Sequence, residues 1–141
     1  MKRLLSFALI AVTTLAAGAC GELGTGPATF SGTYALQSIN GQRVPAPLYY
    51  SSASDHIEIL ASDLTLYDDG SYTDFTRVQD THFAPTRVYD DNTQGTWVVS
   101  GTQLTLADRN DLTHVTYATL SNGRIVIDRF GGYNARAEYV R

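Results

Sequence analysis

Residues 64–75 read LTLYDDGSYTDF, and this stretch decides the fold because it places a turn signal between two segments of strand-forming residues. The dipeptide Asp69-Gly70 favours a tight two-residue turn, since Gly and Asp tolerate the positive φ angles that such turns require. The flanking Leu, Thr, Tyr and Phe residues fit a pleated, half-buried surface. The stretch therefore predicts a β-hairpin.

The predicted hairpin also has a register. A two-residue loop sets Leu64 opposite Phe75 and places Leu66 on the same face, which makes this face the candidate for the core. Tyr67 and Tyr72 would then point to the other face. Because side chains alternate along a strand, a loop longer by one residue would exchange the two faces.

Three further turn signals flank this hairpin: Asn40-Gly41, Ser100-Gly101 and Asn122-Gly123. Two-residue loops at the second and third set Trp97 opposite Leu104, and Leu120 opposite Ile125. The segments between the turns are rich in Thr, Val, Ile, Tyr and Leu, which predicts strands over 31–39, 56–67, 71–79, 86–90, 94–99, 102–107, 113–121, 124–129 and 135–140. After residue 30 no stretch keeps a helical apolar period for three turns, and 47–52 makes one helical turn at most.

These hairpins predict an all-β domain over residues 30–141, built as a single antiparallel up-and-down meander of eight to nine strands. A meander of this length avoids exposed edges most simply by closing into a small barrel. The interior of an eight-stranded barrel is just wide enough for packed side chains or for one small ligand. The sequence leaves both interiors open.

Several segments of this meander are similar to the lipocalin-like domains of bacterial lipoproteins. The similarity covers most of residues 30–141 and is carried by GTYAL at 32–36, ING at 39–41, LTL at 64–66, DGSY at 69–72 and GTW at 95–97. In lipocalins the first strand usually has Gly-x-Trp, with the Trp under an Arg from the last strand. Tyr34 stands at that position here, and Arg136 or Arg141 would be its partner.

The resemblance implies an apolar ligand held inside the barrel. Residues 44–50 form a long, aromatic segment stiffened by proline, which is expected either to act as a lid over the mouth or to plug the barrel end as core. The candidate ligand-binding side chains come from this segment and from the inner faces of the expected strands: Tyr34, Leu48, Tyr49, Tyr50, Leu64, Leu66, Phe75, Trp97 and Tyr139.

The N-terminus has the pattern of an export signal. Lys2 and Arg3 precede an uncharged run over 4–17, which is shorter than the roughly 20 residues of a membrane-spanning helix. Gly18-Ala19-Cys20 resembles the bacterial lipobox, so residues 1–19 are expected to be a signal peptide with a helical apolar core and Cys20 the site of lipid attachment. The alternative is an ordinary secretory signal cleaved after Ala19, which would leave Cys20 as a free thiol.

Lipidation at Cys20 would make residues 20–29 a flexible tether rich in small residues. Several acyl chains on one residue would hold the domain stably on a membrane. Gly21 follows the cysteine, where enteric-type bacteria commonly use Asp to retain a lipoprotein in the inner membrane. The expected location is therefore the cell envelope, on the outer membrane, facing either the periplasm or the cell surface.

The net charge of the chain limits the classes of partner that the domain is expected to bind. The chain has 10 basic and 14 acidic side chains, and removal of Lys2 and Arg3 with the signal peptide takes the formal net charge from −4 to −6. An acidic domain is unsuited to nucleic acid and to electrostatic docking on anionic lipid. The membrane would be reached through the lipid anchor alone, and no feature of the sequence indicates an oligomeric state.

Catalytic patterns are absent from the sequence. His56 and Glu58 share a strand face and could meet His82 or His114, but their spacing matches no recognised metal-ligand pattern. The chain has no Gly-x-Ser-x-Gly motif, and Cys20 is its one cysteine. We therefore expect no enzyme, cofactor or metal. The alternative to a ligand-binding lipoprotein is an interaction or inhibitor module with a packed barrel, whose outer face or loops over 79–93 would contact another envelope protein.

Overall fold

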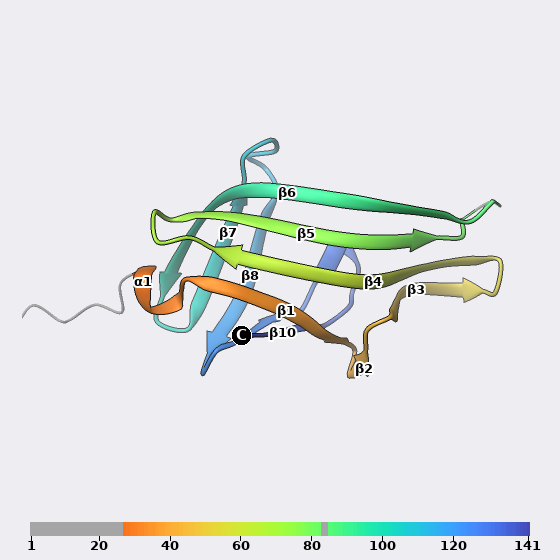
Figure 1. Ribbon diagram of the computed structural model, residues 1–141, viewed down its shortest axis with the longest axis horizontal. Helices are drawn as coiled ribbons and strands as arrows, with labels where there is room; N and C mark the ends of the chain where they lie inside the picture. The colour runs from red at the N-terminus through yellow and green to blue at the C-terminus, as the bar shows by residue number, and fades with distance from the viewer. Residues whose placement is uncertain (1–26, 83–84) are drawn as a thin grey trace, which may run out of the picture.

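Ten β-strands form one continuous antiparallel sheet in the computed structural model, which describes residues 27–82 and 85–141 (Figure 1). The expected signal peptide and Cys20 lie outside the described residues. Across the described ranges, no helix has the length and apolar character needed to cross a membrane. The elements are a helical turn α1 (Pro27–Phe30), β1 (Gly32–Ile39), β2 (Gln42–Arg43), β3 (Ala46–Ser52), β4 (Asp55–Leu66), β5 (Ser71–Asp80), β6 (Arg87–Ser100), β7 (Gln103–Asp108), β8 (Val115–Ser121), β9 (Arg124–Ile127), a 3-10 turn η1 (Phe130–Gly132) and β10 (Ala137–Val140).

The sheet closes into a barrel because β1 pairs with strands on both of its sides. Its first half pairs with β4, with Gly32 opposite Leu66, while its second half pairs with β10, with Ile39 opposite Ala137. Strands β1 and β4 to β10 thus form a closed eight-stranded antiparallel barrel, and β2 and β3 extend the sheet at its two ends. The expected barrel is confirmed.

The barrel has two unlike ends. At the closed end, β4 pairs with β1, and short turns at 67–70, 101–102 and 122–123 join the strands. At the open end, the first part of β4 pairs with β3 instead, and β6 pairs with β5 alone until Gly95, where its pairing with β7 begins. The long strands β4, β5 and β6 therefore project beyond the shorter ones, as Figure 1 shows.

The main core fills the closed end. Tyr34, Leu64, Leu104 and Tyr139 are each at most 1% exposed. Trp97 lies among them, and its indole Nε1 donates a hydrogen bond of 3.0 Å to the Tyr67 carbonyl oxygen. The closed end therefore holds a well-buried part of the hydrophobic core.

Two of the predicted turns form as expected. Asn40-Gly41 and Asn122-Gly123 both have positive φ angles at both residues, as a two-residue primed turn requires. Leu120 lies opposite Ile125, so the register predicted for the last hairpin is confirmed. At the Ser100-Gly101 signal the loop is Gly101-Thr102, which places Trp97 opposite Leu106 instead of Leu104. A slip of two residues keeps the same face inward.

The register predicted around Asp69-Gly70 is wrong by one residue. The Tyr67 amide donates to the Ser71 carbonyl oxygen at 2.9 Å, so the loop has three residues and Gly70 takes a positive φ of 82° at its end. The Asp69 carboxylate accepts hydrogen bonds from the amide and hydroxyl of Ser71, which stabilises the longer loop. As a result Tyr72 is buried at 5% exposure, while Phe75 points outward at 36%.

The segment expected as a lid or a helical turn is a strand. Residues of β3 pair with β4, with Ala46 opposite Ile59 and Tyr49 opposite Ile57. The strands expected over 86–90 and 94–99 are likewise one strand, β6. Both differences have one cause: the long strands β4 and β5 offer backbone donors and acceptors along their whole length, which neighbouring segments satisfy by pairing.

Candidate ligand-binding cavity

A cavity of about 490 Å³ opens inside the barrel at its open end. Its walls are the inner faces of β4, β5 and β6, the ends of β7 to β9, and η1 with the residues around it. Cavities of this size lie within the range of small-ligand sites, roughly 300–1,000 Å³. Its apolar lining is Leu48, Ile57, Ile59, Val78, Leu106, Ile127 and Phe130.

A buried polar network lies on one wall of this cavity. The Ser62 hydroxyl donates to the Asp74 carboxylate at 3.1 Å and is 2.9 Å from the Tyr139 hydroxyl, while the Thr76 hydroxyl donates to Ser62 Oγ at 2.9 Å. Asp74 and Thr76 both line the cavity. The network links the packed closed end to the cavity and fixes the position of the Asp74 carboxylate.

Burial raises the pKa of Asp74 to about 6. The negative charges of Asp91 and Asp63 raise this pKa further, and hydrogen bonds from Ser62 and Thr76 oppose the shift. A buried carboxyl resists ionisation because the charged form loses its solvation. Asp74 is therefore mostly, but not fully, ionised at neutral pH.

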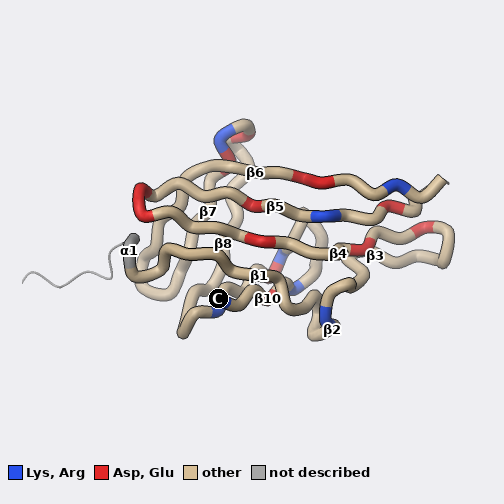
Figure 2. The backbone as a smooth tube through the Cα atoms, in the orientation of Figure 1, with Lys and Arg blue, Asp and Glu red and all other residues tan. Residues whose placement is uncertain are grey.

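Three more carboxylates line the cavity: Asp91 on β6, Asp108 at the end of β7 and Asp111 in the following loop. Asp108 and Asp111 also stabilise that loop, since each accepts hydrogen bonds from backbone amides two residues later. Burial raises the pKa of Tyr72 to about 12, and the charges of Asp108 and Asp74 add to the shift. Figure 2 shows acidic positions on each of the long strands β4, β5 and β6.

Aromatic side chains lie at the rim. Tyr89 and Tyr133 line the cavity, and the Tyr133 ring is 5.9 Å from that of Tyr49, measured between centroids. The Tyr49 ring is in turn 5.8 Å from the imidazole of His82. These rings bring amphipathic surface to the cavity mouth, a common feature of binding sites.

A second hollow of about 450 Å³ lies where β6 leaves β7, over Gly95, Asp108 and Leu112. Most of its lining side chains are exposed ones on the outer surface, such as Thr73, Gln94 and Thr96. The first cavity is the better candidate because it lies between the inner faces of the barrel strands, and because its lining combines apolar side chains with polar groups that could orient a ligand.

The side chains expected to bind a ligand separate into three groups. Tyr34, Leu64, Leu66, Trp97 and Tyr139 pack together in the closed end, away from the cavity lining. Leu48 lines the cavity, and Tyr49 contacts its rim. Tyr50 is 65% exposed, and Phe75 lies on the outer face. Binding by any of them stays a prediction.

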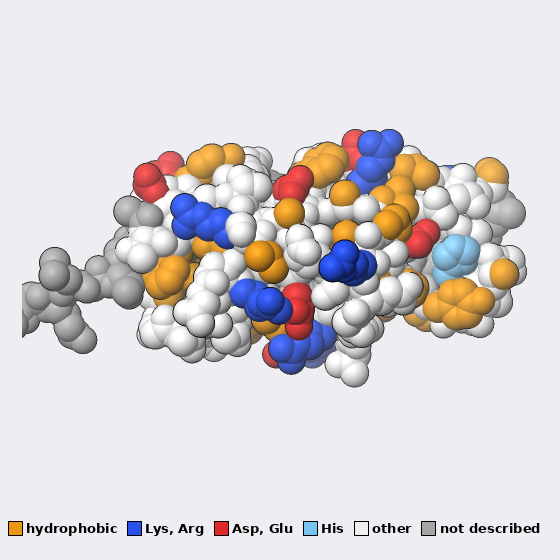
Figure 3. All heavy atoms as spheres, turned by 60° about the horizontal axis from the view of Figure 1, so that its bottom comes forward, with side chains coloured by type: hydrophobic (Ala, Val, Ile, Leu, Met, Phe, Trp, Pro, Cys, Tyr) orange, Lys and Arg blue, Asp and Glu red, His pale blue; other side chains and the backbone are white. Residues whose placement is uncertain are grey.

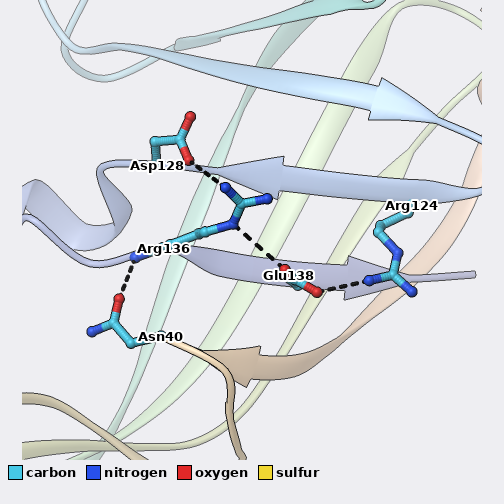
Figure 4. A network of polar contacts seen from close by, with 5 residues as sticks. All are labelled: Asn40, Arg124, Asp128, Arg136 and Glu138. Atoms are coloured by element: carbon cyan, nitrogen blue, oxygen red, sulfur yellow. Dashed lines mark hydrogen bonds and ion pairs between the residues drawn. The ribbon is translucent and has the colours of Figure 1, made fainter.

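Of the two arginines expected near Tyr34, the structure brings Arg141 there. Burial raises the pKa of Tyr34, and the neighbouring Arg141 guanidinium opposes that shift through its charge and a hydrogen bond. Arg136 instead joins a network on the outer face, with contacts to Asp128 at 3.6 Å and Glu138 at 3.5 Å (Figure 4).

Sequence reasoning missed the acids that line the cavity, including Asp74 and Asp91 on the inner strand faces. The expected two-residue loop placed Phe75 inward, and therefore Asp74 outward. The three-residue loop reverses this, and because Asp74 lies opposite Thr93, the odd-numbered residues of β6 also face inward. The signal that could have revealed the site is Asp69 two residues before Ser71, an arrangement that favours the longer loop.

The histidines considered as metal ligands do not form a cluster. His82 Nδ1 lies 2.8 Å from the Asp55 carboxylate, and His56 Nε2 lies 3.5 Å from the Thr81 hydroxyl. His114 lines the cavity instead. Within residues 27–82 and 85–141, no group of three or more His, Cys, Asp or Glu side chains is arranged to hold a metal ion.

Comparison with known proteins gives one match. The family model described as a lipocalin-like domain matches residues 30–127, from the end of α1 to the end of β9. No curated protein and no solved structure matches the chain.

Proposed function

The chain belongs to the lipocalin-like domain family, and we propose on that basis that its open-end cavity binds a small, partly apolar molecule. The observation that carries this proposal is the cavity of about 490 Å³ between the long strands. Leu106 and Ile127 provide apolar contact on one side of it, and Ile57 and Val78 provide it on the other. The proposed activity is binding, in keeping with a fold that generally serves to bind ligands and not to catalyse reactions.

The two halves of the barrel support this assignment together. A completely packed barrel would have no room for a ligand, whereas Leu64, Leu104 and Tyr139 fill the closed end only. The packed end holds the strand positions fixed, so the cavity is largely formed before a ligand arrives. Pre-formed sites lose less conformational entropy on binding.

The location of the domain is the second part of the proposal. The pattern at Gly18-Ala19-Cys20 supports export, lipidation of Cys20 and tethering to a membrane of the cell envelope. Mass spectrometry of protein purified from its native membrane tests this directly. We expect a chain that begins at acylated Cys20, and expect Cys20→Ser to release a folded domain; an unmodified Cys20 would contradict the assignment.

Binding is tested with N-phenyl-1-naphthylamine, an apolar fluorophore whose amine is too weakly basic to be protonated at neutral pH. We expect its emission to rise when it enters the cavity of the lipid-free domain. Thr93→Trp places a large ring in the cavity and should weaken binding at least about tenfold. Asn92→Trp is the matched control, because Asn92 is the exposed neighbour on the same strand and lies outside the cavity lining.

The control variant should bind the fluorophore within about twofold of the wild-type affinity, a difference of roughly 0.4 kcal/mol. Circular dichroism verifies that both variants are folded. The binding proposal fails if the wild-type domain does not enhance the emission, or if Thr93→Trp and Asn92→Trp behave alike.

A further inference from the structure

We propose that the cavity selects ligands in which a positively charged amino group adjoins an apolar part, and that Asp74 and Asp91 recognise the amino group. This inference rests on the proposed function, because it assigns a chemical class to the ligand of the same cavity. Three observations support it: the position of the two carboxylates on the inner face of the barrel, the distribution of ion pairs in the described part of the chain, and the hydrogen bonds that hold Asp74.

The first observation is position. Asp74 and Asp91 lie within strands, on the inner face of the barrel, and not in turns where Asp serves the backbone. In the register of β5 and β6, Asp74 lies opposite Thr93 and Thr76 lies opposite Asp91. The two acids are thus diagonal neighbours on one face, close enough for the charge of Asp91 to act on Asp74.

The second observation is that, in the described part of the chain, acidic side chains form ion pairs on the outer face of the barrel but not in the cavity. On the outer face, Asp90 lies 3.9 Å from Arg77, and Glu138 lies 2.7 Å from Arg124. Acidic and basic side chains also lie side by side on the face shown in Figure 3. Inside, no ion pair in the described part of the chain engages Asp74, Asp91, Asp108 or Asp111.

The balance of charge in the cavity is therefore negative. Four carboxylates line it, against one arginine, Arg129, and one histidine, His114. Like charges that line one cavity raise each other's electrostatic free energy. A bound ammonium group would lower that energy, whereas a carboxylate ligand such as a fatty acid would raise it.

The third observation is that the Asp74 carboxylate is already fixed in place. Ser62 donates a hydrogen bond to it, and Thr76 in turn donates to Ser62. A carboxylate held by hydroxyl groups presents its charge in one direction, and a cation can bind it with little further ordering. Charge-assisted hydrogen bonds to such a group are about twice as strong as neutral ones.

The apolar walls define the remainder of the ligand. Ile57, Val78, Leu106 and Ile127 line the cavity around the acids. A purely ionic ligand would make no use of these apolar side chains, and a purely apolar ligand would displace water from the acids without giving them a partner. A primary or secondary amine on a hydrocarbon or aromatic skeleton satisfies both.

The experiment compares three probes with the same chain: octylamine, 1-octanol and octanoate. Each competes with N-phenyl-1-naphthylamine for the wild-type domain at pH 7.5. We expect octylamine to displace the fluorophore at a concentration about tenfold lower than 1-octanol, the scale of one charge-assisted hydrogen bond, and octanoate to compete least.

Three variants assign this preference to residues. Asp74→Asn and Asp91→Asn should each reduce the octylamine preference about threefold to tenfold while leaving 1-octanol unchanged. Asp90→Asn is the matched control, since it removes the same charge from the adjacent, outward-facing position of β6. Asp91 is exposed, so its variant tests the proposal independently of the buried hydrogen bonds around Asp74.

The outcomes separate this inference from the proposed function. If the fluorophore binds but 1-octanol competes as well as octylamine, the amine preference is overturned and the binding function stands. An equal effect of Asp90→Asn and Asp91→Asn also overturns it, since the preference would then reflect overall surface charge. Octylamine binding is also measured directly, from changes in the NMR chemical shifts of the wild-type domain. If neither the fluorophore nor octylamine binds, both proposals fail.

Discussion

The closed and open ends of the barrel are built from the same strands but present opposite chemistry to the interior. Along β6 the inward positions change from Trp97, at 4% exposure, to the exposed Asp91. Along β7 they change from the fully buried Leu104 to the half-buried Asp108. The two ends of the barrel thus have different roles: the packed end stabilises the fold, and the open end contains carboxylates that destabilise it.

The pairing of the strands explains how one barrel accommodates both. At the closed end β1 joins β4, so side chains from all walls meet and exclude water. At the open end β4 pairs with β3 in place of β1, and the first part of β6 does not pair with β7. Water reaches the inner faces there, and carboxylates such as Asp91 are tolerated.

Gly95 lies at the boundary between the two ends, and we expect its substitution to destabilise the fold more than any other change considered below. A Cβ atom at this position would lie 1.9 Å from the Ala107 carbonyl oxygen and 2.8 Å from the Tyr72 ring. We expect Gly95→Ala to lower the free energy of unfolding by roughly 3 kcal/mol or more, because the clash involves backbone of the paired strand. Urea denaturation measures this.

The exposed neighbour Thr96 provides the control, and Thr96→Ala should change the free energy of unfolding by less than about 0.5 kcal/mol. A Gly95→Ala variant with the wild-type denaturation midpoint would show that β6 and β7 need not approach closely at this boundary.

A matched pair of leucines sharpens the contrast in packing. Leu104→Ala empties a fully buried site in the closed end and should cost about 3 kcal/mol of unfolding free energy. Leu48→Ala removes a half-buried side chain from the cavity wall and should cost about 1 kcal/mol, because water already reaches that site. Thermal unfolding compares the two, and equal losses would contradict a division into a packed end and a hollow end.

Asp74→Asn should change stability in the opposite direction from the substitutions above. The pKa of Asp74 rises from its ordinary value of 3.8 to about 6 in the fold, so the folded state holds this proton more tightly than the unfolded chain does. Its contribution to stability is therefore complete below pH 4 and is lost as the pH rises through 6. Asn cannot ionise, and we expect it to stabilise the domain by up to about 3 kcal/mol at pH 7 and by little at pH 4.

Burial is the main cause of the raised pKa of Asp74; the charges of Asp91 and Asp63 raise it further, and hydrogen bonds from the hydroxyls of Ser62 and Thr76 lower it. Urea unfolding at pH 4, 5, 6 and 7 follows the difference between the Asp74→Asn and wild-type domains. A difference that does not grow with pH would mean that Asp74 is not destabilised by burial.

The hairpins show how far local sequence could predict this fold. Asn122-Gly123 specifies its turn through two residues that both tolerate positive φ, and its register was predicted correctly. Ser100-Gly101 allows two turn positions, yet a slip of two residues leaves Trp97 facing inward. At Asp69-Gly70 the predicted register is wrong by one residue, so that Tyr72 faces inward and Phe75 outward. Because side chains alternate between the two faces of a strand, an error of one residue reverses every one of them.

The candidate site was less predictable than the fold. Strand β3 contains Pro47 and follows Pro45, a composition that gives a weak strand signal, and it forms because it pairs with β4. Asp74 and Asp91 have the appearance of surface acids in the sequence. Their inward position follows from a single extra residue in the 68–70 loop, stabilised by the Asp69 side chain.

The amino-acid sequence is enough to predict an all-β domain of short-turn hairpins, an acidic net charge and an N-terminal pattern typical of lipoprotein export. These features depend on interactions between residues close together in the chain. The tertiary structure alone decided that β1 closes the barrel against β4, that the closed end is packed and that Asp74 and Asp91 face the open end. Those features depend on pairings between distant strands, whose register sums the lengths of every turn between them.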